Sequence, residues 1–134
     1  MILKIFTDGG SKGNPGPSSI GVVGYSDGKK VFEIGKSIGI ATNNDAEYQA
    51  LIAALELVKL RTTNHERRTN KIEFYSDSRL MVNQVKGLFK IKNGKIKEYM
   101  LKIRSLEQEI NLPMSYNYVP REQNQEADKL VNSV

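Results

Sequence analysis

Apolar residues recur along the chain at two spacings, and these spacings predict where strands and helices lie. Residues 2–7 (ILKIFT) are β-prone and apolar on both faces, as expected of a central strand, and the run GGSKGNPGP ends it. Two more strands are expected at 20–25 and 31–40, because Asp27 and Gly28 between them are a strong hairpin signal. The second of these strands alternates, with four apolar residues on one face: Phe32, Ile34, Ile38 and Ile40.

The clearest helix is expected at 45–61, where apolar residues recur at helical spacing: Ala46, Ala50, Ala53, Ala54, Leu57 and Val58. Shorter elements follow in order: a loop around His65, a strand at 72–75, helices at 78–86 and 96–109 around a connection at 87–94, a strand at 116–119 and a helix from 123 onward. The order β-β-β-α-β-α-α-β-α indicates a single α/β domain over residues 1–134.

The directions of the strands follow from their connections. If the first strand points up, hairpin pairing makes the second point down and the third point up. A crossover through the long helix then lets the strand at 72–75 rise parallel to the first. Open α/β sheets place their sites at the carboxyl ends of parallel strands, so we expect a functional edge at this end of the sheet.

Four carboxylates from distant segments are expected at that edge. Asp8 follows the first strand, Asp77 follows the fourth, Glu47 lies in the first turn of the long helix, and Asp128 lies early in the last helix. Such a cluster would repel itself unless divalent cations neutralised it, and hard oxygen ligands favour Mg²⁺ or Mn²⁺. The sequence therefore predicts a metal site.

Each carboxylate also has a structural interpretation. Asp8 before two glycines is an ordinary turn residue, Asn44-x-x-Glu47 fits a helix capping box, and Asp77 can cap a helix that begins at Ser78. Asp128 lies beside an apolar stripe, where a solvated face is common. Helix capping does not require these residues to lie at the same sheet edge as a strand-end aspartate. The placement of all four carboxylates at one edge therefore favours the metal site.

Composition narrows the chemistry further. The chain has 134 residues, no cysteine and one histidine, His65. A chain of this length buries roughly two-thirds of the surface that it exposes when unfolded, so it can form a core without disulfides or structural metals. The absence of cysteine excludes thiolate nucleophiles and zinc ribbons. Carboxylates must therefore carry any catalysis.

The net charge of +5 is unevenly distributed. Residues 84–104 contain seven basic side chains against the single acidic Glu98, so the rest of the chain is nearly neutral. A confined basic stretch indicates a polyanion such as nucleic acid, and the alternative is a solvated, lysine-rich helix face. There is no apolar run of 18 residues, and MILKIFTDGG turns polar after six residues. We therefore expect a soluble, cytoplasmic protein with no membrane partner.

Four sequence blocks resemble type 1 ribonuclease H in order and spacing. They are TDGGSKGNPGP after the first strand, TNNDAEYQAL at the start of the long helix, YSDSRLMVNQV after the fourth strand, and VPREQNQEADKLVN near the end. Together they span nearly the whole chain. The resemblance implies a five-stranded mixed sheet of order 3-2-1-4-5, with strand 2 antiparallel, flanked by helices.

The resemblance also implies an activity, namely endonucleolytic cleavage of the RNA strand of an RNA–DNA hybrid by a two-metal-ion mechanism. By motif, Asp8 would bridge two Mg²⁺ or Mn²⁺ ions in the substrate complex, and Asp128 would help hold the ion that activates water. Glu47 and Asp77 would hold the ion that stabilises the leaving oxygen. Two alternatives stay open: the same fold acting on double-stranded RNA, or an inactive nucleic-acid binding protein of this fold.

Substrate contacts carry over by position. Polar, uncharged groups suit a minor groove lined with 2′-hydroxyls, and the candidates for them are Gly9, Asn14, Thr42, Asn43 and Asn44. The phosphate contacts are expected from basic residues: Arg79, Lys86, Lys90, Lys92, Lys95 and Lys97. Between these lysines, three apolar residues are expected to anchor the segment in the core: Leu88, Phe89 and Ile91.

Two features depart from the family pattern. The basic segment is short and lacks the tryptophans of longer bacterial handles. The loop before the last helix carries VPRE where many members have a histidine, so Arg121 or Glu122 is the candidate for a role in turnover. His65 is not expected to be catalytic, and a monomer is expected.

Overall fold

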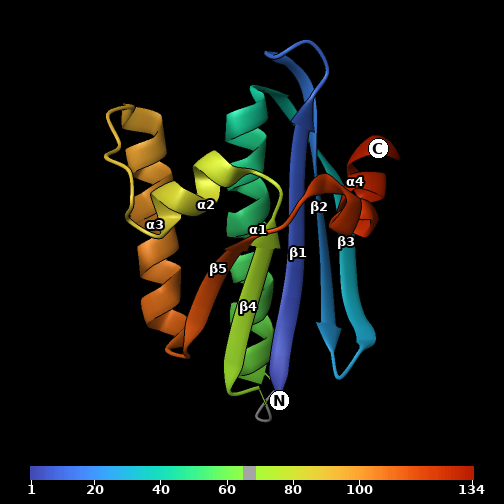
Figure 1. Ribbon diagram of the computed structural model, residues 1–134, viewed down its shortest axis with the longest axis vertical. Helices are drawn as coiled ribbons and strands as arrows, with labels where there is room; N and C mark the ends of the chain where they lie inside the picture. The colour runs from blue at the N-terminus through green and yellow to red at the C-terminus, as the bar shows by residue number, and fades with distance from the viewer. Residues whose placement is uncertain (65–68) are drawn as a thin grey trace.

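The computed structural model describes residues 1–64 and 69–134, which contain a five-stranded mixed sheet. The strands are β1 (Ile2–Ser11), β2 (Gly16–Ser26), β3 (Lys29–Ala41), β4 (Lys71–Ser76) and β5 (Met114–Tyr118). Their order across the sheet is β3-β2-β1-β4-β5 (Figure 1). Strand β2 runs antiparallel to β1 and β3, whereas β4 runs parallel to β1 and β5. The predicted fold class, strand order and direction of strand 2 are confirmed.

Helices cover both faces of this sheet. They are α1 (Asn43–Asn64), α2 (Arg79–Val85), α3 (Gly94–Ile110) and α4 (Gln125–Asn132), and a 3-10 turn at Arg121–Gln123 precedes the last of them. A Cβ on Gly9 would point into α1, whereas a Cβ on Gly21, which pairs with Asp8, would point into α4. Since neighbouring residues of a strand face opposite sides, α1 and α4 lie on opposite faces of the sheet.

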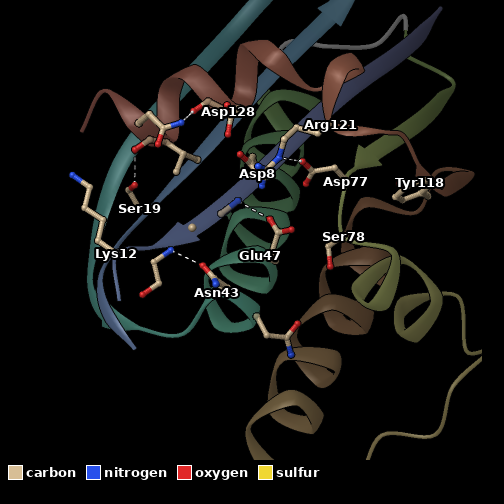
Figure 2. A pocket seen from close by; sticks show the side chains of 16 residues that line it. Asp8, Lys12, Ser19, Asn43, Glu47, Asp77, Ser78, Tyr118, Arg121 and Asp128 are labelled. Carbon is tan, nitrogen blue, oxygen red and sulfur yellow. Dashed lines mark hydrogen bonds and ion pairs between the residues drawn. The ribbon is translucent and has the colours of Figure 1, made fainter. Parts of the chain in front are cut away.

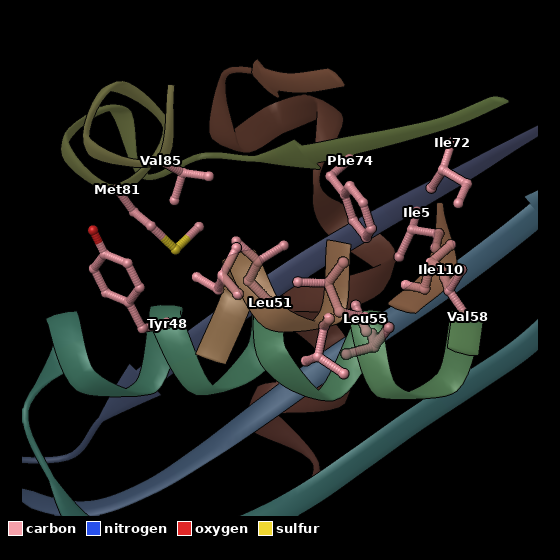
Figure 3. Close-up of a cluster of buried hydrophobic side chains, with 14 of the residues drawn as sticks. Ile5, Tyr48, Leu51, Leu55, Val58, Ile72, Phe74, Met81, Val85 and Ile110 are labelled. Atoms are coloured by element: carbon pink, nitrogen blue, oxygen red, sulfur yellow. The ribbon is translucent and has the colours of Figure 1, made fainter. Parts of the chain in front are cut away.

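The main core lies between the sheet and helices α1 to α3 (Figure 3). Tyr48, Leu51, Leu55 and Val58 project from α1 and are essentially inaccessible to solvent. Of the six apolar residues expected on this helix, Ala53 and Leu57 are half-buried and the others are fully buried. The helix is apolar on more than one side because it contacts both the sheet and α3.

The hairpin between β2 and β3 has the expected turn. Asp27 and Gly28 have φ of 52° and 75°, and two successive positive φ values are the requirement of a type I′ turn. The expected alternation along β3 is wrong at its end, since Ile40 is 73% exposed. Pairing passes from Ser37 to Gly39 and skips Ile38, so a β-bulge changes the facing of the residues beyond it.

The segment between α2 and α3 also differs from expectation. Leu88 and Phe89 are 64% and 50% exposed and do not anchor the core, whereas Ile91 packs against it. Residues 88–93 form neither helix nor strand, so no regular period holds their side chains to one face. The expected loop around His65 lies outside the described residues.

Candidate active site

Two aspartates meet where the parallel pairing of β1 and β4 ends. Asp77 follows β4 as expected, but Asp8 lies within β1, because pairing with β2 continues this strand to Ser11, beyond the expected end at residue 7. The register of β1 and β4 pairs Thr7 with Ser76, so Asp8 and Asp77 follow at the same level of the sheet. Glu47 reaches this edge from α1 (Figure 2). One carboxylate oxygen from each of Asp8, Glu47 and Asp77 lies within 4.8 Å of the other two.

Neither Glu47 nor Asp77 serves as a helix cap. Thr42 and Asp45 cap α1 reciprocally: the Asp45 backbone N–H donates to Oγ1 of Thr42 at 3.1 Å, and the Thr42 hydroxyl donates to Oδ2 of Asp45 at 2.9 Å. At the start of α2, Oγ of Ser78 accepts from the backbone N–H of Met81. The structural interpretations of Glu47 as part of a capping box with Asn44, and of Asp77 as a cap, are therefore wrong.

A glycine allows Glu47 to approach β1. The backbone N–H of Gly9 donates to Oε1 of Glu47 at 2.6 Å. A Cβ on Gly9 would lie 2.3 Å from the backbone carbonyl atoms of Ala46, so any other residue would push α1 away from the strand. Gly9 therefore has a structural role in holding Glu47 beside Asp8.

The fourth carboxylate, Asp128, comes from α4 on the other face of the sheet. It lines the same cleft as the other three and its side chain interacts with that of Asp8. It lies outside the tight group of three carboxylates described above. The four predicted residues thus line one cleft, with Asp8 in contact with the carboxylates from both faces of the sheet.

The cluster is unfavourable for negative charge. Burial, followed by the charges of Asp77 and Asp128, raises the pKa of Asp8 to about 8. Burial and the charges of Asp8 and Asp77 raise the pKa of Glu47 well above its ordinary value. Among the described ion pairs, the one that reaches this cluster joins Nε of Arg121 to Oδ2 of Asp77 at 3.7 Å, and the Arg121 side chain is 82% exposed. Hard oxygen donors with little compensating charge fit a divalent cation.

The cleft has a volume of about 660 Å³. Of the predicted substrate contacts outside the basic segment, Gly9, Asn43 and Asn44 line it, as does Arg121. Sequence reasoning missed several lining residues, of which Lys12 and Tyr118 are the largest. Lys12 could have been found, because it lies in the glycine-rich loop four positions after Asp8.

Three other predicted substrate residues do not line the cleft: Asn14, Thr42 and Arg79. Oδ1 of Asn14 accepts from the backbone N–H of Asn43 at 2.8 Å, and Oδ1 of Asn43 accepts from the backbone N–H of Ser11 at 2.8 Å. These bonds tie the glycine-rich loop to the start of α1. Thr42 is engaged in the cap of α1, and the guanidinium of Arg79 lies over the ring of Tyr118, 4.6 Å from its centroid.

The five predicted lysines are all exposed and lie outside the cleft: Lys86, Lys90, Lys92, Lys95 and Lys97. Nζ of Lys95 is 3.4 Å from Oδ2 of Asp45, the capping residue of α1. The basic segment is thus connected to the helix that carries Glu47. Within residues 1–64 and 69–134, no helix combines the length and apolar character needed to cross a membrane.

Comparison with known proteins agrees with this geometry. A family model described as "Reverse transcriptase-like" matches residues 6–134. Ribonuclease HI of Halobacterium salinarum is 39% identical over 131 residues, covering 97% of this chain and 62% of that protein. A bifunctional protein of Mycobacterium tuberculosis is 38% identical over 135 residues, covering 98% of this chain and 35% of that protein. The chain thus spans about a third of the length of the mycobacterial relative and less than two-thirds of the length of the Halobacterium one.

Solved structures show the same likeness over the whole fold. LC11-RNase H1, solved in complex with an RNA/DNA hybrid, superposes with a TM-score of 0.90 at 40% identity, covering 98% of this chain and 95% of that one. RNase H1 of Halobacterium salinarum superposes with a TM-score of 0.89 at 37% identity, covering 99% and 96%. The carboxylate cluster, the strand order and these similarities together show that the chain belongs to the reverse transcriptase-like family, and within it to the type 1 ribonucleases H.

Proposed function

We propose that this chain is a metal-dependent endonuclease that hydrolyses the RNA strand of RNA–DNA hybrids. The observation that carries the proposal is the convergence of Asp8, Glu47 and Asp77 within 4.8 Å, with Asp128 in the same cleft. The similarity to LC11-RNase H1, whose structure contains an RNA/DNA hybrid, supports the choice of substrate.

The four carboxylates would hold two Mg²⁺ or Mn²⁺ ions in the substrate complex. Asp8 would bridge both, Asp128 would share the one nearer the attacking water, and Glu47 and Asp77 would share the one nearer the leaving oxygen. When bound, such ions supply an activated water and stabilise the departing oxygen of an in-line displacement. This requires no nucleophilic side chain, in agreement with a sequence that has no cysteine.

The protein's own contribution is to keep these oxygens in place and ready to bind. The Gly9 backbone N–H fixes one oxygen of Glu47, and the parallel register of β1 and β4 fixes the level of Asp8 and Asp77. Because burial raises the pKa of Asp8 to about 8, cation binding must displace a proton there. Metal affinity is therefore expected to rise with pH.

Substrate would be held on both sides of the carboxylates. The amides of Asn43 and Asn44 and the backbone near Gly9 face the cleft, where they suit the 2′-hydroxyls of an RNA strand. Asn14 and Thr42 support them through the glycine-rich loop and the cap of α1. The exposed lysines at 86, 90, 92, 95 and 97, with Arg79, would contact phosphates and make binding dependent on salt.

Arg121 is the better candidate for the turnover role, because it lines the cleft and pairs with Asp77. Glu122 lies outside that cleft, and its negative charge would repel a phosphate. We further propose that the enzyme is monomeric and cytoplasmic and has no membrane partner.

The test uses labelled RNA–DNA hybrid, double-stranded RNA and double-stranded DNA, each with Mg²⁺, Mn²⁺ or EDTA. We expect cleavage of the RNA strand of the hybrid with either metal and none with EDTA. Asp77→Asn should abolish cleavage, whereas Glu56→Gln, an exposed carboxylate further along α1, should not alter it. Preferential cleavage of double-stranded RNA would reassign the substrate, and hybrid binding without cleavage would make the chain a binding protein.

A further inference from the structure

Asn124 lies at the start of α4, the helix that carries Asp128, and its side chain does not cap that helix. Asn124 is 1% exposed, and its Nδ2 donates to the backbone carbonyl of Thr7 at 2.9 Å. Thr7 immediately precedes Asp8 on β1. The side chain therefore connects the start of α4 to the strand position next to Asp8, 117 residues away in sequence.

The backbone of the same residue reaches Asp128. The Asp128 N–H donates to the carbonyl oxygen of Asn124 at 3.1 Å, in the first turn of α4. One residue thus contacts the neighbour of Asp8 through its side chain and Asp128 through its backbone. This path fixes the first turn of α4 relative to β1 at Thr7.

This arrangement is costly for stability. An asparagine at a helix start usually caps the helix, and here that contribution is lost because the amide is directed to β1. In addition, Oδ1 of Asn124 is buried and has no hydrogen-bond partner among the described residues. A buried acceptor without a donor is unfavourable, so stability alone does not explain an asparagine at this position.

Other contacts already attach α4 to the sheet. Oγ of Ser19 on β2 donates to the carbonyl of Val131 at 2.7 Å, and Ala127 and Val131 are buried against the strands. The absence of a Cβ on Gly21 lets the backbone of Ala127 approach closely. These contacts hold α4 on the sheet independently of Asn124. The specific effect of Asn124 is therefore to fix the position of the first turn of the helix.

We propose that Asn124 is a positioning residue that sets the separation between Asp128 and Asp8, and hence the affinity of the cation that these two carboxylates share. This inference rests on the proposed function. Without the amide, α4 would keep its apolar contacts, but its first turn would no longer be tied to β1. The Asp128 carboxylate would then sample positions too far from Asp8 for both to bind one ion.

The informative variant is Asn124→Ser, because serine is a good helix cap but is too short to replace the hydrogen bond from the side-chain amide to the carbonyl of Thr7. Ser19→Ala is the comparison variant. Ser19 also lines the cleft, but its hydroxyl bonds to Val131 in the last turn of α4, so the substitution removes a hydrogen bond between α4 and the sheet without releasing the first turn of the helix. Mn²⁺ binding is measured by calorimetry on the whole chain without substrate. The Mg²⁺ dependence of hybrid cleavage and the melting temperature are measured on the same samples.

For Asn124→Ser we expect the affinity for the Mn²⁺ ion shared by Asp8 and Asp128 to fall by about tenfold or more, and the Mg²⁺ concentration for half-maximal cleavage to rise by a similar factor. KM for the hybrid at saturating Mg²⁺ should change by less than about twofold, because the amide is directed at β1. Ser19→Ala should lower the melting temperature without altering Mn²⁺ binding. Unchanged Mn²⁺ affinity in Asn124→Ser, or an equal loss in Ser19→Ala, would overturn the inference.

If Asn124→Ser does not fold, Asn124→Ala provides the same comparison without a new cap. Two failures are distinguishable. Parent protein that binds Mn²⁺ and cleaves the hybrid, together with an unaffected Asn124 variant, would refute the positioning role alone. Parent protein that neither binds Mn²⁺ nor cleaves would refute the proposed function and this inference with it.

Discussion

Asp45 and Thr42 close the start of α1 with reciprocal hydrogen bonds, the Thr42 backbone N–H and hydroxyl donating to Oδ2 of Asp45 at 3.3 and 2.9 Å. Oδ1 of Asp45 also accepts from the hydroxyl of Tyr99 on α3 at 3.3 Å. Asp45 therefore caps this end of the helix and contacts α3. Glu47, two residues later, takes no part in the cap and lies beside Asp8 and Asp77.

Substitution of these two acidic residues should separate stability from activity. Asp45→Ala is expected to lower the free energy of unfolding by about 1 kcal/mol, with kcat reduced less than about threefold, because a cap is lost but no metal ligand. Glu47→Gln should leave the metal-free fold as stable or more stable, since a carboxyl that is buried beside Asp8 and Asp77 is replaced by a neutral amide, but should abolish cleavage. Urea unfolding and steady-state cleavage of a hybrid measure both effects. Equal loss of activity in the two variants would contradict this division.

The same two residues show how far sequence reasoning reaches. Thr42-x-x-Asp45 and Asn44-x-x-Glu47 both fit a capping box, and they overlap, so local pattern cannot choose between them. Convergence of the carboxylates was predictable because it depends on strand order and direction, which connections constrain.

Other parts of the structure depend on contacts that no local pattern records. The bulge at Ile38 arises in pairing between β2 and β3, and the close approach of Gly9 to Ala46 depends on how α1 crosses the end of β1. The outward position of Leu88 and Phe89 is set by an irregular segment with no period to interpret. The bond from Asn124 to Thr7 joins residues at opposite ends of the chain.

The metal-free protein should lose stability as pH rises. The pKa of Asp8 is about 8 in the folded protein and about 4 in an unfolded chain, so between these values the folded state binds more protons. Unfolding free energy then falls with rising pH across this window, and Glu47 acts in the same direction. Carboxylates with lowered pKa, such as Asp45 and Glu73, complete their opposite contribution below about pH 5.

Thermal melting in EDTA between pH 5 and pH 8 tests this expectation. The melting temperature should decline over this range in the parent protein and decline less in Asp8→Asn, which should also be the more stable of the two at pH 8. Saturating Mg²⁺ should reduce the decline, because a bound cation favours the ionised carboxylates. An identical pH dependence in Asp8→Asn would show that the cluster is not the source.

The lysines of the basic segment should affect binding rather than chemistry. Joint replacement of Lys90, Lys92 and Lys97 by alanine is expected to raise KM about tenfold with little change in kcat, because these side chains contact phosphate and not the reacting atoms. The slope of log affinity against log salt should fall by about two to three. Lys29 and Lys36, exposed on β3, provide the matched control pair. A loss confined to kcat would contradict a positioning role.

Arg121 should raise kcat by a factor that does not depend on pH. Its Nε lies 3.7 Å from Oδ2 of Asp77 and its side chain is largely exposed, so the guanidinium can move between this carboxylate and a phosphate in the cleft. Arg121→Ala is expected to lower kcat about tenfold, and the ratio to the parent should be constant from pH 6 to 9 because arginine stays charged there. Arg121→Lys should restore part of the rate, and Glu122→Gln should leave it unchanged. A kcat ratio that varies with pH would assign the effect to a titrating neighbour, and an unaltered kcat in Arg121→Ala would remove this residue from turnover.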